Sequence, residues 1–132
     1  MPDRPPIFLT LDEVLAIHER LLEAFGGPKG ARDLGLLESA LYRPRSGYYE
    51  DLPSMAAALF ESLLMNHRFL DGSKRVAFFA TDVFLRINGY HLEVKPDTAH
   101  AHLIGLLERN AADKKALEKW LRRHLKSGPR IR

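Results

Sequence analysis

A potential proton acceptor, a carboxylate, a glycine turn and two cations follow one another in one short segment. The segment reads His67-Arg68-Phe69-Leu70-Asp71-Gly72-Ser73-Lys74-Arg75. If the apolar run after it forms a helix, the first free amides and the positive end of the helix dipole lie beside Lys74 and Arg75, which suits a phosphate group. Asp71 offers the oxygen ligands that Mg²⁺ prefers, and His67 could accept a proton from an approaching hydroxyl. The pattern indicates phosphoryl or nucleotidyl transfer.

The length and composition predict a single domain over residues 1–132. The chain has 132 residues, of which 45% are hydrophobic and 28% charged, which is ordinary for a globular protein. It has no cysteine, so disulfides and thiolate metal sites are excluded. The start of the chain is polar and rich in proline, and no long apolar run follows. We therefore expect a cytoplasmic protein without a membrane segment.

The basic residues are concentrated at the end of the chain. From Lys119 onward there are six Lys/Arg and no acidic residue, whereas the preceding 118 residues hold 14 basic and 17 acidic residues. Such a tail usually keeps a helix end solvated, and cations favour a helix C-terminus. We expect no direct nucleic-acid binding, and we expect residues 127–132 to fray as a basic tail.

Helical periodicity dominates the rest of the chain and predicts an all-α domain of about six helices. Thr10 and Glu13 match a capping box before the first helix, which Gly26 ends. Residues 1–7 form an N-terminal extension. The later helices are predicted at 33–42, 53–66, 73–87, 97–107 with Asp97 as N-cap, and 113–125 with Asp113 as N-cap, and residues 91–94 could form one short strand.

The third and fourth predicted helices are apolar on nearly every side. Such helices suit central positions, with the other helices around them. The motif lies in the loop that connects these two helices, so we expect a polar loop held by a buried, rigid support.

The motif resembles that of the Fic/Doc superfamily, in which His-Pro-Phe is followed by a variable residue, Asp or Glu, Gly or Ala, Asn, Gly or Lys, and Arg. Lys74 stands where adenylyl-transferring members usually carry glycine, which indicates the Doc (death-on-curing) branch. Further stretches of roughly residues 8–110 are also similar, namely Leu11–His18, Arg32–Ala40 and Phe84–Tyr90.

The resemblance implies a Fic fold and the toxin of a type II toxin–antitoxin pair. Such a toxin is a protein kinase that uses ATP and Mg²⁺, transfers the γ-phosphate to a threonine of elongation factor Tu and blocks translation. Its partner would be a Phd-like antitoxin, whose C-terminal segment folds onto apolar helices near the motif. We expect the loop Arg43–Leu52 to act as a target-docking flap at the edge of that groove, and Arg45 and Arg68 to favour an acidic segment.

The resemblance also implies a role for each motif residue. His67 would be the general base and Asp71 the Mg²⁺ ligand. Gly72, Ser73, Lys74 and Arg75 would bind the nucleotide phosphates, with Lys74 and Arg75 also neutralising charge during transfer.

Three positions depart from the family pattern and leave two alternatives open. Arg68 replaces the motif proline, and Ser73 replaces the asparagine that presents an amide to phosphate. Phe78 stands where adenylyl-transferring members carry a second arginine, which argues against AMP transfer in its usual geometry. The alternatives are AMP transfer to a protein hydroxyl, and a catalytically impaired Fic-fold protein that only binds its antitoxin.

Overall fold

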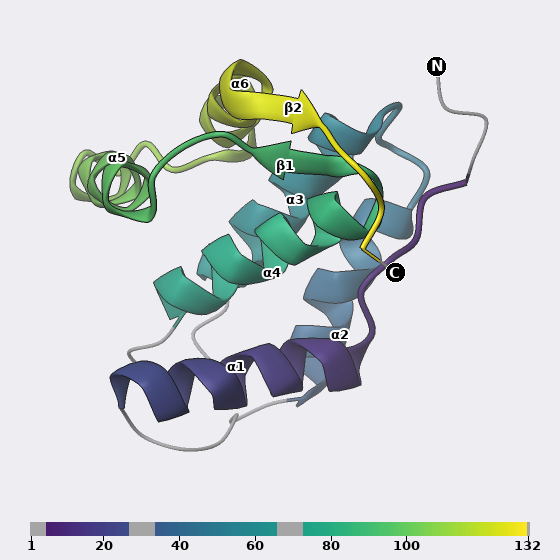
Figure 1. The fold of residues 1–132 in the computed structure, drawn as a ribbon, viewed down its shortest axis with the longest axis horizontal. Helices are drawn as coiled ribbons and strands as arrows, with labels where there is room; N and C mark the ends of the chain where they lie inside the picture. The colour runs from purple at the N-terminus through teal and green to yellow at the C-terminus, as the bar shows by residue number, and fades with distance from the viewer. Residues whose placement is uncertain (1–4, 27–33, 66–72, 132) are drawn as a thin grey trace.

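The computed structural model describes residues 5–26, 34–65 and 73–131, with only the backbone described at Phe25, Leu34, Leu36 and Ser73. Figure 1 shows helices α1 (Leu11–Phe25), α2 (Leu34–Tyr42), α3 (Leu52–Met65), α4 (Ser73–Ile87), α5 (Pro96–Glu108) and α6 (Lys114–His124). A 3₁₀ turn, η1 (Arg43–Arg45), follows α2, and two short strands, β1 (Tyr90–Leu92) and β2 (Leu125–Ser127), form a small sheet. The mostly helical fold confirms the predicted class.

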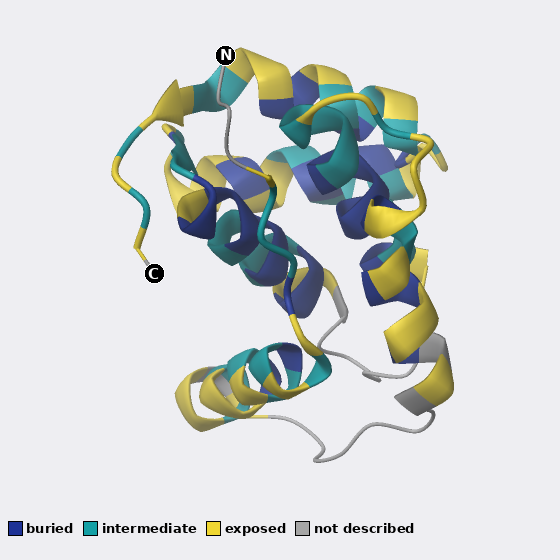
Figure 2. Ribbon diagram, turned by 90° about the vertical axis from the view of Figure 1, so that its right-hand side faces the viewer, coloured by how far each residue is buried: buried dark blue, intermediate teal, exposed yellow. Residues whose placement is uncertain are grey.

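Helices α3 and α4 pack against each other at the centre, as their apolar sequences predict. α2 and α6 also pack on α3, while α1 and β1 pack on α4. Buried residues from all of these helices form one hydrophobic cluster, shown in dark blue in Figure 2. Each large apolar side chain that is fully buried contributes about 1.5–3 kcal/mol relative to exposure. The largest fully buried side chains include Phe60, Leu59 and Leu63 of α3 and Phe84, Leu85 and Val76 of α4.

The predicted helix caps are confirmed at α1 and α6 and are wrong at α5. The backbone N–H of Glu13 donates to the Thr10 hydroxyl at 3.2 Å, and the Thr10 N–H donates to the Glu13 carboxylate at 2.9 Å. Asp113 accepts from the N–H of Ala116 at 2.9 Å. α5, in contrast, has Lys95 as N-cap without a side-chain hydrogen bond. Pro96 occupies the first helical position, which its fixed φ favours, so the helix begins before Asp97.

The small sheet corrects the expectation of a frayed end. β1 and β2 are antiparallel, with Tyr90 opposite Ser127 and Leu92 opposite Leu125. Beyond β2, the N–H of Gly128 donates to Gly89 O at 2.8 Å and that of Ile131 to Arg86 O at 3.3 Å. The chain after α6 therefore finds backbone partners at the end of α4. A sequence-based reading misses this pairing because the two strands are separated by two helices.

The segment before α1 is also held against the end of α4. The Asn88 side chain accepts from the N–H of Ile7 and donates to the carbonyls of Ile7 and Phe84, each at 2.8 Å. The Phe8 and Phe84 rings stack at 6.0 Å. The segment before α1 and the segment after β2 thus both contact the C-terminal end of α4.

Candidate functional site

The described part of the motif is the first turn of α4. α4 begins at Ser73, as predicted, and Lys74 and Arg75 are both exposed there. Val76 and Ala77, the next two residues, are fully buried against the core. The two cations are therefore presented on a helix whose position is fixed by packing rather than on a free loop.

These two cations stand at the end of α4 where the helix dipole disfavours positive charge. The first turn of α4 contains no acidic residue. α6 also begins with lysines, but two carboxylates bind its first amides: Asp113 caps it, and Glu61 accepts from the N–H of Lys114 at 2.9 Å. The two cations repel each other, and the positive end of the helix dipole disfavours each of them. A bound anion relieves both the repulsion and the dipole effect. The first turn of α4 has the electrostatics of an anion site.

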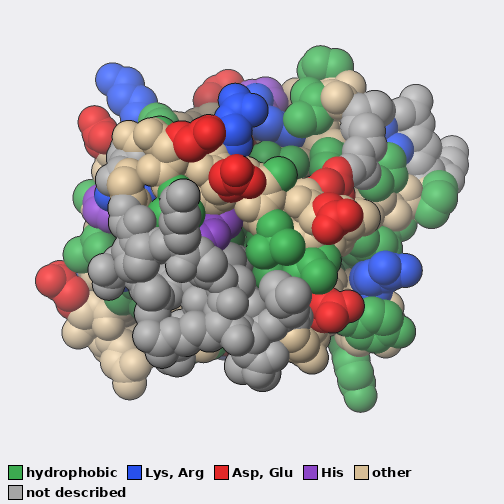
Figure 3. Space-filling view, turned by 90° about the horizontal axis from the view of Figure 1, so that it is seen from below, with side chains coloured by type: hydrophobic (Ala, Val, Ile, Leu, Met, Phe, Trp, Pro, Cys, Tyr) green, Lys and Arg blue, Asp and Glu red, His purple; other side chains and the backbone are tan. Residues whose placement is uncertain are grey.

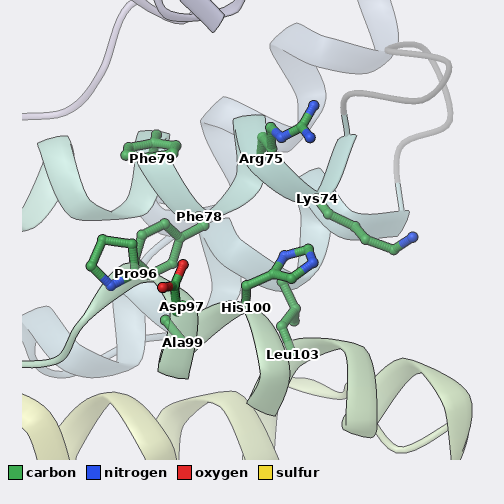
Figure 4. A pocket seen from close by; sticks show the side chains of 9 residues that line it. All are labelled: Lys74, Arg75, Phe78, Phe79, Pro96, Asp97, Ala99, His100 and Leu103. Atoms are coloured by element: carbon green, nitrogen blue, oxygen red, sulfur yellow. The ribbon is translucent and has the colours of Figure 1, made fainter. Parts of the chain in front are cut away.

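A cavity of about 260 Å³ opens between the start of α4 and α5 (Figure 4). α4 contributes its two cations and two phenylalanines, and α5 contributes the opposite wall. The lining residues are Lys74, Arg75, Phe78, Phe79, Pro96, Asp97, Ala99, His100 and Leu103. Positive charge at one end and mainly apolar walls beyond it, among which Asp97 and His100 are the polar members, match a ligand with an anionic part and an aromatic or aliphatic part.

Sequence reasoning missed the α5 wall of this cavity. In Figure 4, Phe78 extends from α4 toward Pro96 and Asp97, and the His100 ring lies on the side of Lys74. Asp97 is predicted from sequence only as a helix cap, and the sequence analysis assigns no role to His100 or His102. The structure separates those two histidines: His100 lines the cavity, and His102 stacks on Trp120. The spacing of residues along the chain gives no indication that α5 lies beside the motif.

The remaining predicted site residues stay predictions. His67, Asp71 and Gly72 lie outside the described residues, and at Ser73 only the backbone is described. Within the ranges that the structure describes, no three His, Asp or Glu side chains gather in a way that could hold a metal ion. In the same ranges, no helix is both long enough and apolar enough to cross a membrane.

The loop Arg43–Leu52 precedes α3, whereas Lys74 and Arg75 follow the end of α3, and its role as a target-docking flap stays a prediction. α3 has 14 residues and is therefore about 21 Å long, and the loop precedes its first residue. Lys74 and Arg75 belong to the opposite end of the α3–α4 pair (Figure 1). The reason is that α3 leads away from the loop before the chain turns back as α4.

Polar contacts fix this loop to α3 and α6. Arg43 donates to Tyr49 Oη at 2.8 Å and to a Glu61 carboxylate oxygen at 2.7 Å. Burial opposes the charge of Arg43, but the hydrogen bonds to Glu61 and Tyr49 outweigh it and raise the pKa of Arg43. Arg122 of α6 donates to both oxygens of Asp51 at 3.0 Å. These contacts tie the loop to Glu61 of α3 and, through Asp51, to Arg122 of α6.

The face on which α1 lies carries acidic side chains beside apolar ones (Figure 3). The exposed charged residues of α1 are Asp12, Glu19, Arg20 and Glu23. A partner that lies across this face meets more negative than positive charge, which contrasts with the cationic start of α4.

The mostly helical fold, with the described cations at the start of a central helix, agrees with the sequence comparison. The model of the Fic/DOC family matches residues 8–85, and the chain belongs to this family. It is 43% identical over 83 residues to "Toxin Doc" of Mycolicibacterium smegmatis, covering 59% of this chain and 64% of that protein. It is 32% identical over 95 residues to "Protein kinase doc" of Escherichia phage P1, covering 69% of this chain and 75% of that protein. The chain therefore spans just under two thirds of the first relative's length.

Proposed function

We propose that this protein is a Doc-type kinase toxin, a single Fic/Doc domain that acts in the cytoplasm. It transfers the γ-phosphate of ATP to a protein hydroxyl, for which the family resemblance indicates a threonine of elongation factor Tu, and so blocks translation. The observation that carries the proposal is the pair of motif cations, Lys74 and Arg75, which opens onto a cavity at a helix N-terminus. The names of the two relatives, a toxin and a protein kinase, support the same reading.

The cavity suits a nucleotide with its phosphates at the α4 end. Lys74, Arg75 and the first amides of α4 would bind phosphate oxygens, and charge-assisted hydrogen bonds of this kind are roughly twice as strong as neutral ones. The ring of Phe78 and the side chain of Leu103 would face the nucleoside. Their apolar surface excludes water, which strengthens the electrostatic contacts to the phosphates.

The transfer step follows from these positions. His67 would accept the proton of the target hydroxyl while its oxygen attacks the γ-phosphorus. The bond from phosphorus to the bridging oxygen of the nucleotide breaks, and ADP leaves with the electron pair. Lys74 and Arg75 would neutralise the charge that develops on the transferring and leaving oxygens.

Asp71 would hold Mg²⁺ together with the nucleotide's own phosphates. Mg²⁺ usually binds one or two carboxylates plus substrate phosphates, so a cage built only from protein ligands is not needed. When bound, the ion would draw charge from the phosphate oxygens.

The surroundings of Phe78 favour phosphate transfer over AMP transfer. Its ring lies 5.3 Å from that of Phe79 and 6.5 Å from that of Phe60, so it belongs to an aromatic cluster at the edge of the core. Among the described residues that line the cavity, Arg75 has no second arginine beside it to bind the pyrophosphate that AMP transfer would release. The cavity wall is apolar at that point.

The partner would be a Phd-like antitoxin whose C-terminal segment covers apolar helices near the start of α4. Because the exposed charges of α1 are mainly acidic, a segment that lies across α1 would be neutral or basic there, which differs from the acidic segment expected from the sequence.

Labelled ATP tests the reaction. Label that moves from the γ-position to elongation factor Tu supports the kinase, and label that moves from the α-position refutes it in favour of AMP transfer. If neither label moves in the presence of Mg²⁺, the protein is an inactive binder of its antitoxin and the kinase proposal is wrong. Asp12→Asn, an exposed change on α1, serves as the matched active control.

A further inference from the structure

α5 carries a titratable side chain within the stripe of residues that holds it to the rest of the fold. Ala99, Leu103 and Leu106 are buried, and they recur at the spacing of one helix face. His102 belongs to the same face, next to Leu103. α5 lies at the edge of the fold in Figure 1, so this one face supplies its attachment.

The His102 ring stacks on the indole of Trp120, a buried residue of α6. The ring centroids are 5.3 Å apart and the planes differ by 12°. His124 lies on the same indole, with its ring centroid 4.9 Å away and tilted by 51°. These distances are typical of favourable aromatic pairs. Within the described residues, no hydrogen bond to His102 adds to the stack.

The same helix carries the wall of the cavity. Asp97, Ala99, His100 and Leu103 of α5 all line the space that faces Lys74 and Arg75. Leu103 is next to His102 in the chain, so a shift of α5 on α6 also moves the cavity wall.

We propose that His102 is a positioning residue, whose stack on Trp120 fixes α5 in place, and that its protonation loosens α5 and weakens ligand binding in the cavity between α4 and α5. The part of this inference that concerns the ligand rests on the proposed function, since ATP is the ligand used to measure it.

The surroundings of His102 decide the direction of the effect. A cation over an indole face is attracted to it, which by itself favours the protonated ring. Against this, burial lowers the pKa of His102, and Arg109 at the C-cap of α5 together with His124 and Arg123 on α6 lower it further. The neutral ring is therefore the form that the folded protein favours.

The sign of the pH dependence follows. A histidine whose pKa is lower in the folded state stabilises the fold fully above its unfolded pKa of about 6.5. This contribution is lost as the pH falls from that value through the lowered pKa of the folded state. The attachment of α5 should therefore be intact at neutral pH and weaken in mild acid.

The single tryptophan of the chain reports on the stack directly. Tryptophan emission is titrated in the full-length protein and in the variants His102→Gln, His124→Gln and His91→Gln. Wild type and His124→Gln should show a transition with a midpoint below about 6.5, which His102→Gln removes. His91 lies on β1 beside Glu93, so His91→Gln is the matched control and should titrate like wild type. A midpoint above about 6.5 would mean that the attraction of the protonated ring to the indole outweighs burial and the nearby cations. That result would overturn the proposal.

Hydrogen exchange then measures the attachment itself. Between about pH 7.5 and about pH 5.5, protection factors of the α5 amides in wild type should fall by about fivefold. His102→Phe keeps an aromatic ring on Trp120 but cannot titrate, so its α5 protection should not change with pH. Circular dichroism establishes that each variant is folded. If the protection of the α5 amides in wild type does not change with pH, the proposal that the His102 stack holds α5 in place is refuted.

ATP binding, measured by calorimetry at the same two pH values, tests whether protonation of His102 weakens binding in the cavity. The dissociation constant of wild type should rise by about fivefold in acid, and that of His102→Phe should rise clearly less. An equal rise in both proteins would refute the link between His102 and the cavity. If wild type binds no ATP even at neutral pH, the proposed function fails. The fluorescence and exchange results would still show whether the His102 stack holds α5 in place.

Discussion

Replacing Lys74 by alanine should weaken nucleotide binding without lowering the stability of the protein. Lys74 is exposed at the second position of α4, and no hydrogen bond or ion pair involves its side chain within the described residues. Removing a cation from the first turn relieves its repulsion from the helix dipole, which is worth about 0.3–1 kcal/mol. The free energy of unfolding should thus stay the same or rise by up to that amount.

Binding should change in the opposite direction. A charge-assisted hydrogen bond to phosphate contributes about 1.5–3 kcal/mol, so the dissociation constant for ATP should rise by roughly 10- to 150-fold. Lys74→Arg keeps the charge and should lose much less. Calorimetry with ATP and urea denaturation, performed on the same preparations, measure both quantities.

Lys115 provides the control because it occupies the matching position in α6. It is also exposed and is also the second residue of its helix. Lys115→Ala should therefore change stability in the same way as Lys74→Ala and leave ATP binding unchanged. If both variants bind ATP equally well, or if Lys74→Ala is destabilised, the assignment of Lys74 to a phosphate site is wrong.

Three further predictions concern the motif and the scaffold. His67→Ala should lower phosphate transfer by about 10²–10⁴-fold, because a positioned base is lost, with an unchanged far-ultraviolet dichroism spectrum; wild-type rates would exclude His67 as the base. Ser73→Asn should raise the rate of transfer, because the amide of the family motif regains a phosphate hydrogen bond; an equal or lower rate in the same γ-label assay would show that serine already serves there. Asn88→Ala removes three hydrogen bonds of 2.8 Å to Ile7 and Phe84 and should lower the free energy of unfolding by about 3 kcal/mol; a loss below about 1 kcal/mol in urea denaturation would show that water replaces them.

Local signals predicted most of the helices well. The capping box at Thr10, the Asp113 cap and the stop after Ile87 each depend on residues within one turn of one another, so the sequence shows them directly. The start of α5 was predicted wrongly, because Asp97 was taken as its N-cap whereas the helix already begins at Pro96. Proline has no N–H, and an N–H at the first helical position would have no partner within the helix. Pro96 therefore fits that position and sets the start of α5.

The sequence predicted the α4 side of the candidate site but not the α5 side. The cations Lys74 and Arg75 were found because their motif is contiguous, and α4 does begin at Ser73. The loop before α3 was assigned as a flap from the family resemblance, and only the structure shows where it lies relative to Lys74 and Arg75. A helix of 14 residues lies between the two, and it carries them to opposite ends.

The sequence by itself determined the family, the helical class and the motif cations, since each is written in residue types at short, fixed spacings. Only the tertiary structure decided what stands opposite those cations. Asp97 and His100 reach the cavity, His102 reaches Trp120, and Lys126 of β2 lies opposite His91 of β1 in the small sheet. These contacts join elements whose relative positions depend on how the apolar faces of α3, α4 and α6 pack together, and packing is non-local. For that reason the wall of the cavity, and the histidine that we propose positions it, follow from the fold and not from the motif.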